Sequence, residues 1–498
     1  MKKILLIIPL IVLLALGCKK NFDPELYGTL SPVNFPSTES EYELYTLEVY
    51  KPFEAKWGYS ELAWQNNFYS YEYGYVQLFD APTDLFTVFP EWGGFFEAFS
   101  KANFAFLKTQ DRSSHFEKVR FVSRITKIID DLEKSNIRQI SKTELIAEAR
   151  MARGWMMYYL LHMYGPVPVI LDASLLGTNA EADLTRPSRE DFSNSIIEDL
   201  SYAAENLPVH QQEYGRFTKG IAYTILMRHY MNEKDFVKAE ATGREITKLG
   251  YALVPDYASL FREATEVNSE TIYAVSCENG QSGGVEQNSM NAFAFYCYPS
   301  DYPGNKVQGG WPSPNGTYMA TWQFYDSFDS ADTRRDLLIP GYVNKNGEIR
   351  DRSNMRGALI AKYPDEGGDV NSMQGNDVVI ARYAGVLLLL AEAINENNNG
   401  PTAEAIALVD SVRTRAGIKS LEEAGIDIST REAFNDVILS ERGKELYFEG
   451  VRKMDLVRHG KWESALQSVG KTPGPYLFPI PDYAINNSNG KLIQNDGY

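Results

Sequence analysis

The sequence contains very few of the residues on which most metal and catalytic sites depend. It has 3 Cys and 5 His among 498 residues, and none of them has the spacing of a zinc site. EF-hand, P-loop and GxGxxG patterns are absent as well. So few His argue against a metal centre or a His-based triad, and we expect no cofactor. Whether Cys277 and Cys297 form a disulfide is left open, because pairing depends on geometry.

Positive charge and long apolar runs are also scarce. There are 49 Lys and Arg against 66 Asp and Glu, which gives a formal net charge of -17. Nucleic acid needs a basic face, so we expect no nucleic-acid partner. The most apolar internal stretch, Val386–Leu390, is too short to span a bilayer. The hydrophobic content of 44% is that of an ordinary globular protein.

The first seventeen residues have the pattern of an export signal. Basic residues near the start precede an apolar run from Ile4 to Leu16, which is too short for a membrane helix. The end of this run, Ala15-Leu16-Gly17, places small residues before Cys18. We therefore expect residues 1–17 to be a signal peptide.

The cysteine after this signal indicates a lipid anchor. A small residue directly before Cys18 resembles the lipobox of bacterial lipoproteins, although Ala15 and Leu16 are swapped relative to the usual order. In that motif, cleavage leaves the Cys as the lipidated N-terminus. We expect lipidation of Cys18 and a polar tether over residues 18–36. The alternative is an ordinary secretory signal with an incidental Cys.

Apolar periodicity predicts a mostly helical protein. The clearest helix covers Glu144–Tyr164, where apolar residues recur every three or four positions. Ser141 and Glu144 have the spacing of a capping box, and Gly165 with Pro166 marks the end. Because its second half is apolar on nearly every side, this helix should be buried between neighbours.

Two pairs of predicted helices resemble degenerate tetratricopeptide (TPR) repeats. The first pair covers residues 215–230 and 236–249, and the second covers 378–395 and 402–416. Antiparallel pairs of this kind stack into a scaffold. Between them, residues 270–374 are rich in Gly, Asn, Pro and aromatics, so we expect an irregular lobe with short strands.

Aromatic residues gather in two Gly- and Pro-containing segments, residues 57–75 and 296–325. Rings exposed on loops can stack on the apolar face of a sugar, whereas most aromatic residues simply fill cores. The sequence leaves both readings open for each segment. The candidate ligand contacts are Trp57, Trp64, Tyr296, Trp311 and Trp322.

Two glutamates near the C-terminus raise the question of catalysis. Glu441 and Glu445 lie one helical turn apart, and paired carboxylates perform glycoside hydrolysis. Arginines 442, 452 and 458 follow closely, however, and a guanidinium lowers the pKa of a carboxyl, which is wrong for a general acid. We therefore favour a buried ion-pair network that pins the last helices over a glycosidase. Its candidate members are Glu441, Arg442, Glu445 and Arg452.

Five stretches, in order along the chain, together resemble the SusD/RagB-type outer-membrane lipoproteins of Bacteroidetes nutrient-uptake systems. They are Ala147–Arg150 with Tyr164–Pro168, Gly215–Gly220, Arg413–Gly417, Glu441–Leu456, and Phe478–Pro481 with the end Gln494–Tyr498.

The resemblance implies a fold, a partner and a location. It implies TPR-like helix pairs and an irregular ligand-carrying lobe, within an N-terminal region 37–260 and a C-terminal region 261–498. It also implies a non-catalytic protein, anchored in the outer membrane at the cell surface, that binds oligosaccharide and delivers it to a SusC-like TonB-dependent transporter barrel. Two alternatives stay open: a peptide-binding nutrient receptor, and a TPR-type protein-interaction module without its own ligand site.

Overall fold

The computed structural model describes residues 35–55, 67–71, 74–88, 95–109, 115–182, 185–278, 289–304, 306, 315–367 and 374–498. This part of the chain is mostly helical with short strands, which confirms the predicted fold class. None of its helices is long and apolar enough to cross a membrane. Cys18, Trp57, Trp64 and Trp311 lie outside the described residues.

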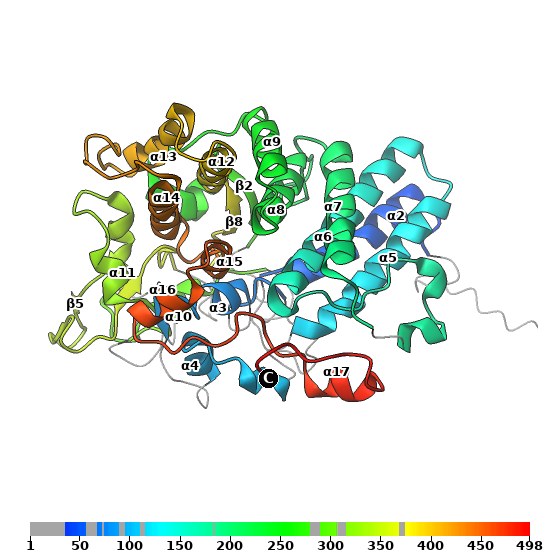
Figure 1. Ribbon diagram of the computed structural model, residues 1–498, viewed down its shortest axis with the longest axis horizontal. Helices are drawn as coiled ribbons and strands as arrows, with labels where there is room; N and C mark the ends of the chain where they lie inside the picture. Colours follow the sequence, from blue (N-terminus) through cyan, green and yellow to red (C-terminus); the bar gives the residue numbers. More distant parts are fainter. Residues whose placement is uncertain are drawn as a thin grey trace, which may run out of the picture.

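A row of packed helices forms the scaffold. In chain order the described helices are α2 (Glu39–Thr46), α3 (Tyr75–Phe79), α4 (Phe95–Ser100), α5 (Val119–Lys134), α6 (Gln139–Tyr164), α7 (Arg189–Asn206), α8 (Lys219–Asn232), α9 (Phe236–Thr247), α10 (Phe293–Cys297), α11 (Trp322–Asp326), α12 (Tyr383–Asn397), α13 (Ala403–Arg415), α14 (Arg431–Leu446), α15 (Arg452–Arg458), α16 (Trp462–Ser468) and α17 (Asp482–Asn487). Each long helix packs on the next, from α5 through α9 to α12, which contacts α13 and α14. Figure 1 shows this row across the top of the molecule.

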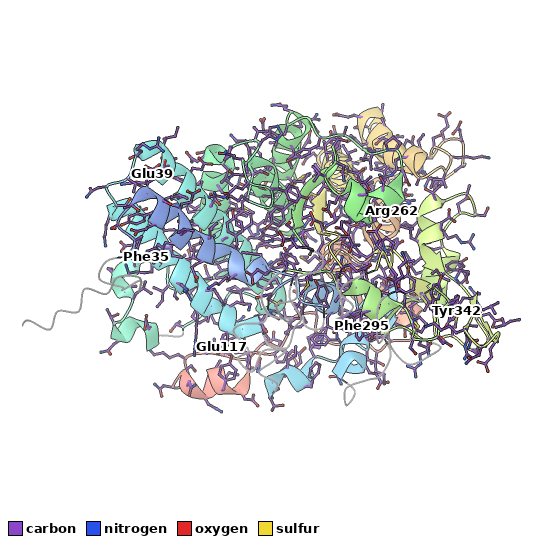
Figure 2. The ribbon with its side chains drawn as sticks, turned by 180° about the vertical axis from the view of Figure 1, so that it is seen from behind. Phe35, Glu39, Glu117, Arg262, Phe295 and Tyr342 are labelled. Atoms are coloured by element: carbon purple, nitrogen blue, oxygen red, sulfur yellow. The ribbon has the colours of Figure 1, made fainter. Side chains whose placement is uncertain are left out.

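Short strands make up the sheets of the irregular lobe. They are β1 (Phe86–Val88), β2 (Thr271–Val275), β3 (Tyr318–Ala320), β4 (Leu338–Ile339), β5 (Tyr342–Val343), β6 (Ile349–Arg350), β7 (Ala358–Ile360) and β8 (Val378–Arg382). Antiparallel pairing gives a four-stranded sheet of order β1-β3-β7-β4 and two-stranded sheets β2-β8 and β5-β6. Because β1 precedes the helical row in sequence, the N-terminal region supplies one edge strand of this lobe. Glu39 on α2 and Tyr342 on β5 mark opposite ends of the molecule (Figure 2).

The start of the second predicted TPR-like pair differs from expectation. Residues 378–382 form strand β8, paired with β2, and helix α12 begins only at Tyr383. The predicted helix over 378–395 is therefore wrong in its first five residues. A short apolar run fits a buried strand as well as a buried helix, and periodicity alone does not separate the two.

Helix α6 is buried as predicted, but it begins differently. It starts at Gln139, and its N-cap, Arg138, makes no side-chain capping bond. The predicted capping box is wrong, because Ser141 Oγ instead donates to Glu39 Oε1 of α2 at 2.7 Å. The helix ends where expected, at Gly165, whose φ is +73° and whose N–H donates to the Leu161 carbonyl at 3.0 Å.

Helices α6 and α7 pack unusually closely at one glycine. A Cβ placed on Gly154 would lie 3.0 Å from Leu200 Cγ and 3.1 Å from Asp199 Cβ. Next to it, the buried Arg153 guanidinium donates two hydrogen bonds to Asp199, at 2.7 and 2.8 Å. The residue at 154 therefore sets the distance between the two helices.

Replacing this glycine tests the packing. Gly154→Leu should destabilise the full chain by about 1–3 kcal/mol, because the extra atoms have no room between α6 and α7. Thermal unfolding of the protein in mild detergent measures the effect. Asn194→Leu on the exposed side of α7 is the control and should leave the melting temperature nearly unchanged. Equal melting temperatures for Gly154→Leu and the parent would contradict the close packing.

Candidate functional site

The described rings of the two aromatic segments lie mainly in the core. Phe68, Tyr69 and Tyr71 are buried, and Tyr296 is 0% exposed. Of the two readings left open for this segment, burial holds for Tyr296, and it is wrong as a candidate ligand contact, since a fully buried ring offers no face to a ligand. Its ring stacks on Tyr71 with centroids 6.4 Å apart. Glycine and proline nearby indicate irregular backbone, but irregular backbone can still direct a ring inward.

These buried rings form one layer, which we call the aromatic floor: Tyr71, Phe293, Tyr296, Tyr318 and Phe448. Phe293 meets Tyr71 edge-on at 5.0 Å and Phe448 at 4.7 Å, and Tyr318 lies 6.3 Å from Tyr296. Offset and edge-on contacts of this kind stabilise beyond simple area burial. The floor is thus a rigid part of the core that joins segments far apart in sequence.

Hydrogen bonds bring the ends of several loops to this floor. Tyr71 Oη donates to the Ala55 carbonyl at 3.3 Å, and Tyr318 Oη donates to the Tyr71 carbonyl at 2.8 Å. The Met290 N–H donates to the same Ala55 carbonyl at 3.0 Å. These bonds join Ala55, Tyr71, Met290 and Tyr318 at one place in the described part of the chain. In the sequence, Ala55 directly precedes the segment with Trp57 and Trp64, and Tyr318 follows the segment with Trp311.

Trp322 is the candidate whose surroundings the structure describes and which is half-buried. It opens helix α11, two residues after β3, and its Nε1 donates to the Met355 carbonyl at 3.3 Å. The Arg352 guanidinium lies 4.6 Å from the ring centroid and pairs with Asp326 at 2.5 Å. The guanidinium lies over the indole, which also packs on the cluster of Met319, Met355 and Leu359, so the exposed Arg352–Asp326 pair supplies the hydrogen-bonding groups at this place.

Glu441 and Glu445 lie in a buried ion-pair network. Arg334, which is 0% exposed, donates from Nη1 to Glu441 at 2.6 Å and to Glu445 at 2.9 Å. Arg413 reaches Glu441 at 3.2 Å, and Arg382 and Arg415 both bind Glu445. The network extends to further buried charges at Glu270, Asp332, Lys362 and Glu449.

The arginines that neutralise the two glutamates are not their neighbours in sequence. Arg442 instead pairs with Asp455 at 2.9 Å, and Arg452 pairs with Asp84 at 2.7 Å. The expectation that Arg442 and Arg452 flank these carboxylates is wrong, because adjacent residues of a helix point in different directions. The four candidate members, Glu441, Arg442, Glu445 and Arg452, are all buried, and each belongs to an ion pair.

The network has the electrostatics of a structural element. Burial raises the pKa of Glu445, but the guanidiniums of Arg415, Arg382 and Arg334 outweigh it and hold that pKa well below its usual value. A carboxyl held ionised and fully paired cannot serve as a general acid. The described residues contain no group of His, Cys, Asp and Glu that could hold a metal ion.

Sequence reasoning did not identify several members of the network. Arg334 and Arg382 lie 107 and 63 residues from their partners Glu441 and Glu445. Arg413 and Arg415 fall within the stretch Arg413–Gly417, one of the five that carry the family resemblance. That resemblance was the only feature of the sequence that drew attention to them. Cys277 and Cys297 are both free and buried, and burial raises the pKa of both thiols.

Comparison with known proteins gives a consistent picture. The chain matches the family model of the SusD family over residues 340–474, and a second, described as "Starch-binding associating with outer membrane", over residues 111–231. It is 25% identical over 415 residues to SusD-like protein P2 of Formosa agariphila, covering 76% of this chain and 77% of that protein.

Solved structures with the same fold cover almost the whole chain. A SusD homologue from Bacteroides thetaiotaomicron superimposes with a TM-score of 0.78 at 21% identity, over 94% of this chain and 99% of that one. Surface glycan-binding protein A of the same organism, in complex with laminarihexaose, superimposes with a TM-score of 0.74 at 20% identity, over 92% and 100%.

Removing one charge from the network tests its role. Glu445→Gln should cost about 3–5 kcal/mol of unfolding free energy, because three buried guanidiniums lose their shared partner. Since the folded-state pKa of Glu445 is lowered, this contribution is present above the unfolded-state value of 4.5 and is lost as the pH falls. The difference between parent and variant should therefore shrink in acid.

Denaturant unfolding from about pH 8 down to about pH 2 measures both effects. The matched control is Glu432→Gln, an exposed glutamate on the same helix, which should change stability by less than about 1 kcal/mol. A Glu445→Gln protein as stable as this control would show that the network does not hold the fold together.

Proposed function

We propose, because this chain belongs to the SusD family, that it is a non-catalytic lipoprotein of the outer membrane that binds oligosaccharide at the cell surface. The observation that carries the proposal is the pair of family matches, one of which is described as starch-binding and associated with the outer membrane. A relative of the same fold binds laminarihexaose. The ligand would then pass to a SusC-like TonB-dependent transporter barrel, with Cys18 as the lipid anchor.

The paired state of the glutamates supports a binding role over hydrolysis. A glycosidase needs one protonated and one ionised carboxyl that face an open cleft. Glu441 and Glu445 are buried, and both are bound by Arg334. Neither carboxyl can therefore reach a glycosidic bond.

In this proposal, the ligand binds beside the aromatic floor, on the segments that carry the tryptophans. Ala55, which precedes the segment with Trp57 and Trp64 in the sequence, and Tyr318, which follows the segment with Trp311, are both bonded to Tyr71 of this floor, and Trp322 follows β3. Binding sites commonly use loops that a rigid core positions. The sugar would stack on these indoles, and polar groups such as Arg352 and Asp326 would bond its hydroxyls.

Single alanine variants test this surface. Each of Trp57→Ala, Trp64→Ala, Trp311→Ala and Trp322→Ala, if its ring stacks on sugar, should weaken binding about tenfold. This corresponds to about 1–2 kcal/mol per ring. Titration calorimetry of the full chain in mild detergent, with a panel of oligosaccharides and peptides, gives the affinities. Binding of peptides alone would favour the peptide-receptor alternative.

Tyr296→Ala is the contrasting variant, because it removes a core ring. It should lower the melting temperature strongly, by the loss of about 3–5 kcal/mol, whereas a ligand-contact variant should melt like the parent. If all four Trp variants bind like the parent, the ligand does not bind beside the aromatic floor. If no variant and no parent binds any oligosaccharide or peptide, the interaction-module alternative holds.

The anchor gives a separate prediction. Cys18→Ala should move the protein from the membrane fraction to the soluble fraction, because acyl chains at Cys18 supply the stable attachment. Fractionation of cells that express either form, followed by immunoblotting, measures the change. Replacement of Ser31 by Ala, within the tether, is the control and should leave the protein in the membrane. Retention of the Cys18→Ala protein in membranes would disprove the lipid anchor.

A further inference from the structure

A cavity of about 230 Å³ lies away from the aromatic floor and is unusually basic for so acidic a protein. The ends of α6 and α8, the start of α7, helix α15 and residues 476–477 enclose it. Its polar lining consists of His162, Arg189, Asn232, Lys234, Lys453, Arg458 and Tyr476. The described lining residues include no carboxylate.

Lys453 is the unusual member of this lining. Lys453 is 1% exposed, yet among the described residues its Nζ has one long hydrogen-bond contact, 3.5 Å to the His162 carbonyl. Its other neighbours are aromatic: the ring of Phe478 lies 4.1 Å from Nζ, and those of Phe104 and Phe79 lie at 5.5 and 5.6 Å. An ammonium has three donors, so most of its hydrogen-bonding capacity is unused. Burial lowers its pKa to about 7.

Other cations of the lining already have partners. Arg458 binds Glu392 at 2.7 Å and Asp455 at 2.8 Å, and Arg189 binds Glu233 at 2.6 Å. In the part of the chain that the structure describes, neither Lys453 nor the exposed Lys234 forms an ion pair with a carboxylate. The cavity thus carries positive charge that this chain does not neutralise.

His162 adds a neutral polar group to the wall. Burial lowers its pKa well below 6.5, and the charges of Arg189, Lys453 and Arg458 lower it further. The imidazole is therefore uncharged near neutral pH, and its Nε2 lies 3.1 Å from Asn232 Nδ2. The excess charge of the cavity consequently rests on the exposed Lys234 and on the protonated form of Lys453, which an oxyanion would favour.

We propose that this cavity binds an oxyanion, with Lys453 as its buried charge partner and Lys234 at the mouth. A carboxylate, sulfate or phosphate group would supply the acceptors that the Lys453 ammonium lacks and would neutralise the excess charge. The volume is below the roughly 300–1,000 Å³ of sites for drug-sized molecules, so it suits an oxyanion alone or on one small ring. This site is separate from the proposed sugar surface and does not depend on it.

Titration calorimetry of the full chain in mild detergent tests the proposal. Sodium sulfate, inorganic phosphate and glucuronate are titrated separately against sodium chloride of matched ionic strength. At least one of them should bind saturably, and the ranking identifies whether a free ion or a sugar acid fits best. Lys453→Met, which keeps the aliphatic stem, should weaken that binding at least tenfold. Lys248→Met, at an exposed lysine directly after the C-terminal end of α9, should leave that binding unchanged.

Melting temperature separates a binding lysine from a structural one. Lys453→Met should melt at or above the parent's temperature without anion, because a buried, poorly bonded charge has been removed. Should the variant not fold, Lys234→Gln is the second test and should weaken binding at least threefold. No saturable binding of any of the three anions, or unchanged binding in both variants, would overturn the proposal.

Discussion

The fold depends on a set of buried charges that hold together separate segments of the C-terminal region, from Glu270 to Glu449. Arg334, Arg382 and Arg415 converge on Glu445, and Arg334 also binds Glu441. The wider network contains as many cations as anions among its described members: Arg334, Lys362, Arg382, Arg413 and Arg415 against Glu270, Asp332, Glu441, Glu445 and Glu449. Each of these buried charges would be costly without its partners, so these segments must fold together.

This network and the aromatic floor share a boundary. Tyr447 and Phe448 directly follow α14, which carries Glu441 and Glu445, and Phe448 packs on Phe293 of the floor. The ion pairs of Glu441 and Glu445 and the ring contacts of Phe448 therefore fix the same short stretch, residues 441–448. A support of this kind can hold the side chains of neighbouring loops in fixed positions.

The buried cations of this protein have two different kinds of surroundings. Arg334 and Arg382 are surrounded by carboxylates, so their charge is neutralised within the chain. Lys453 is equally buried but meets three aromatic rings and one distant carbonyl. Cation–π contacts recover only part of the lost hydration of an ammonium. The cavity beside α15 therefore contains a buried cation that no described carboxylate pairs, whereas every cation of the network is paired.

Local patterns in the sequence determined the helices, whereas packing over long distances decided the contacts of the candidate site. Apolar periodicity and Gly165 were enough to predict helix α6 and its end, because helix formation depends on residues three and four apart. The same periodicity could not tell strand β8 from the start of α12. Tyr296, a candidate ligand contact that could have been exposed or buried, lies in the core. Glu441 was assigned the wrong arginine, since its partner Arg334 lies 107 residues away. No local pattern records which distant ring or charge a folded chain brings alongside, so only the tertiary structure could decide them.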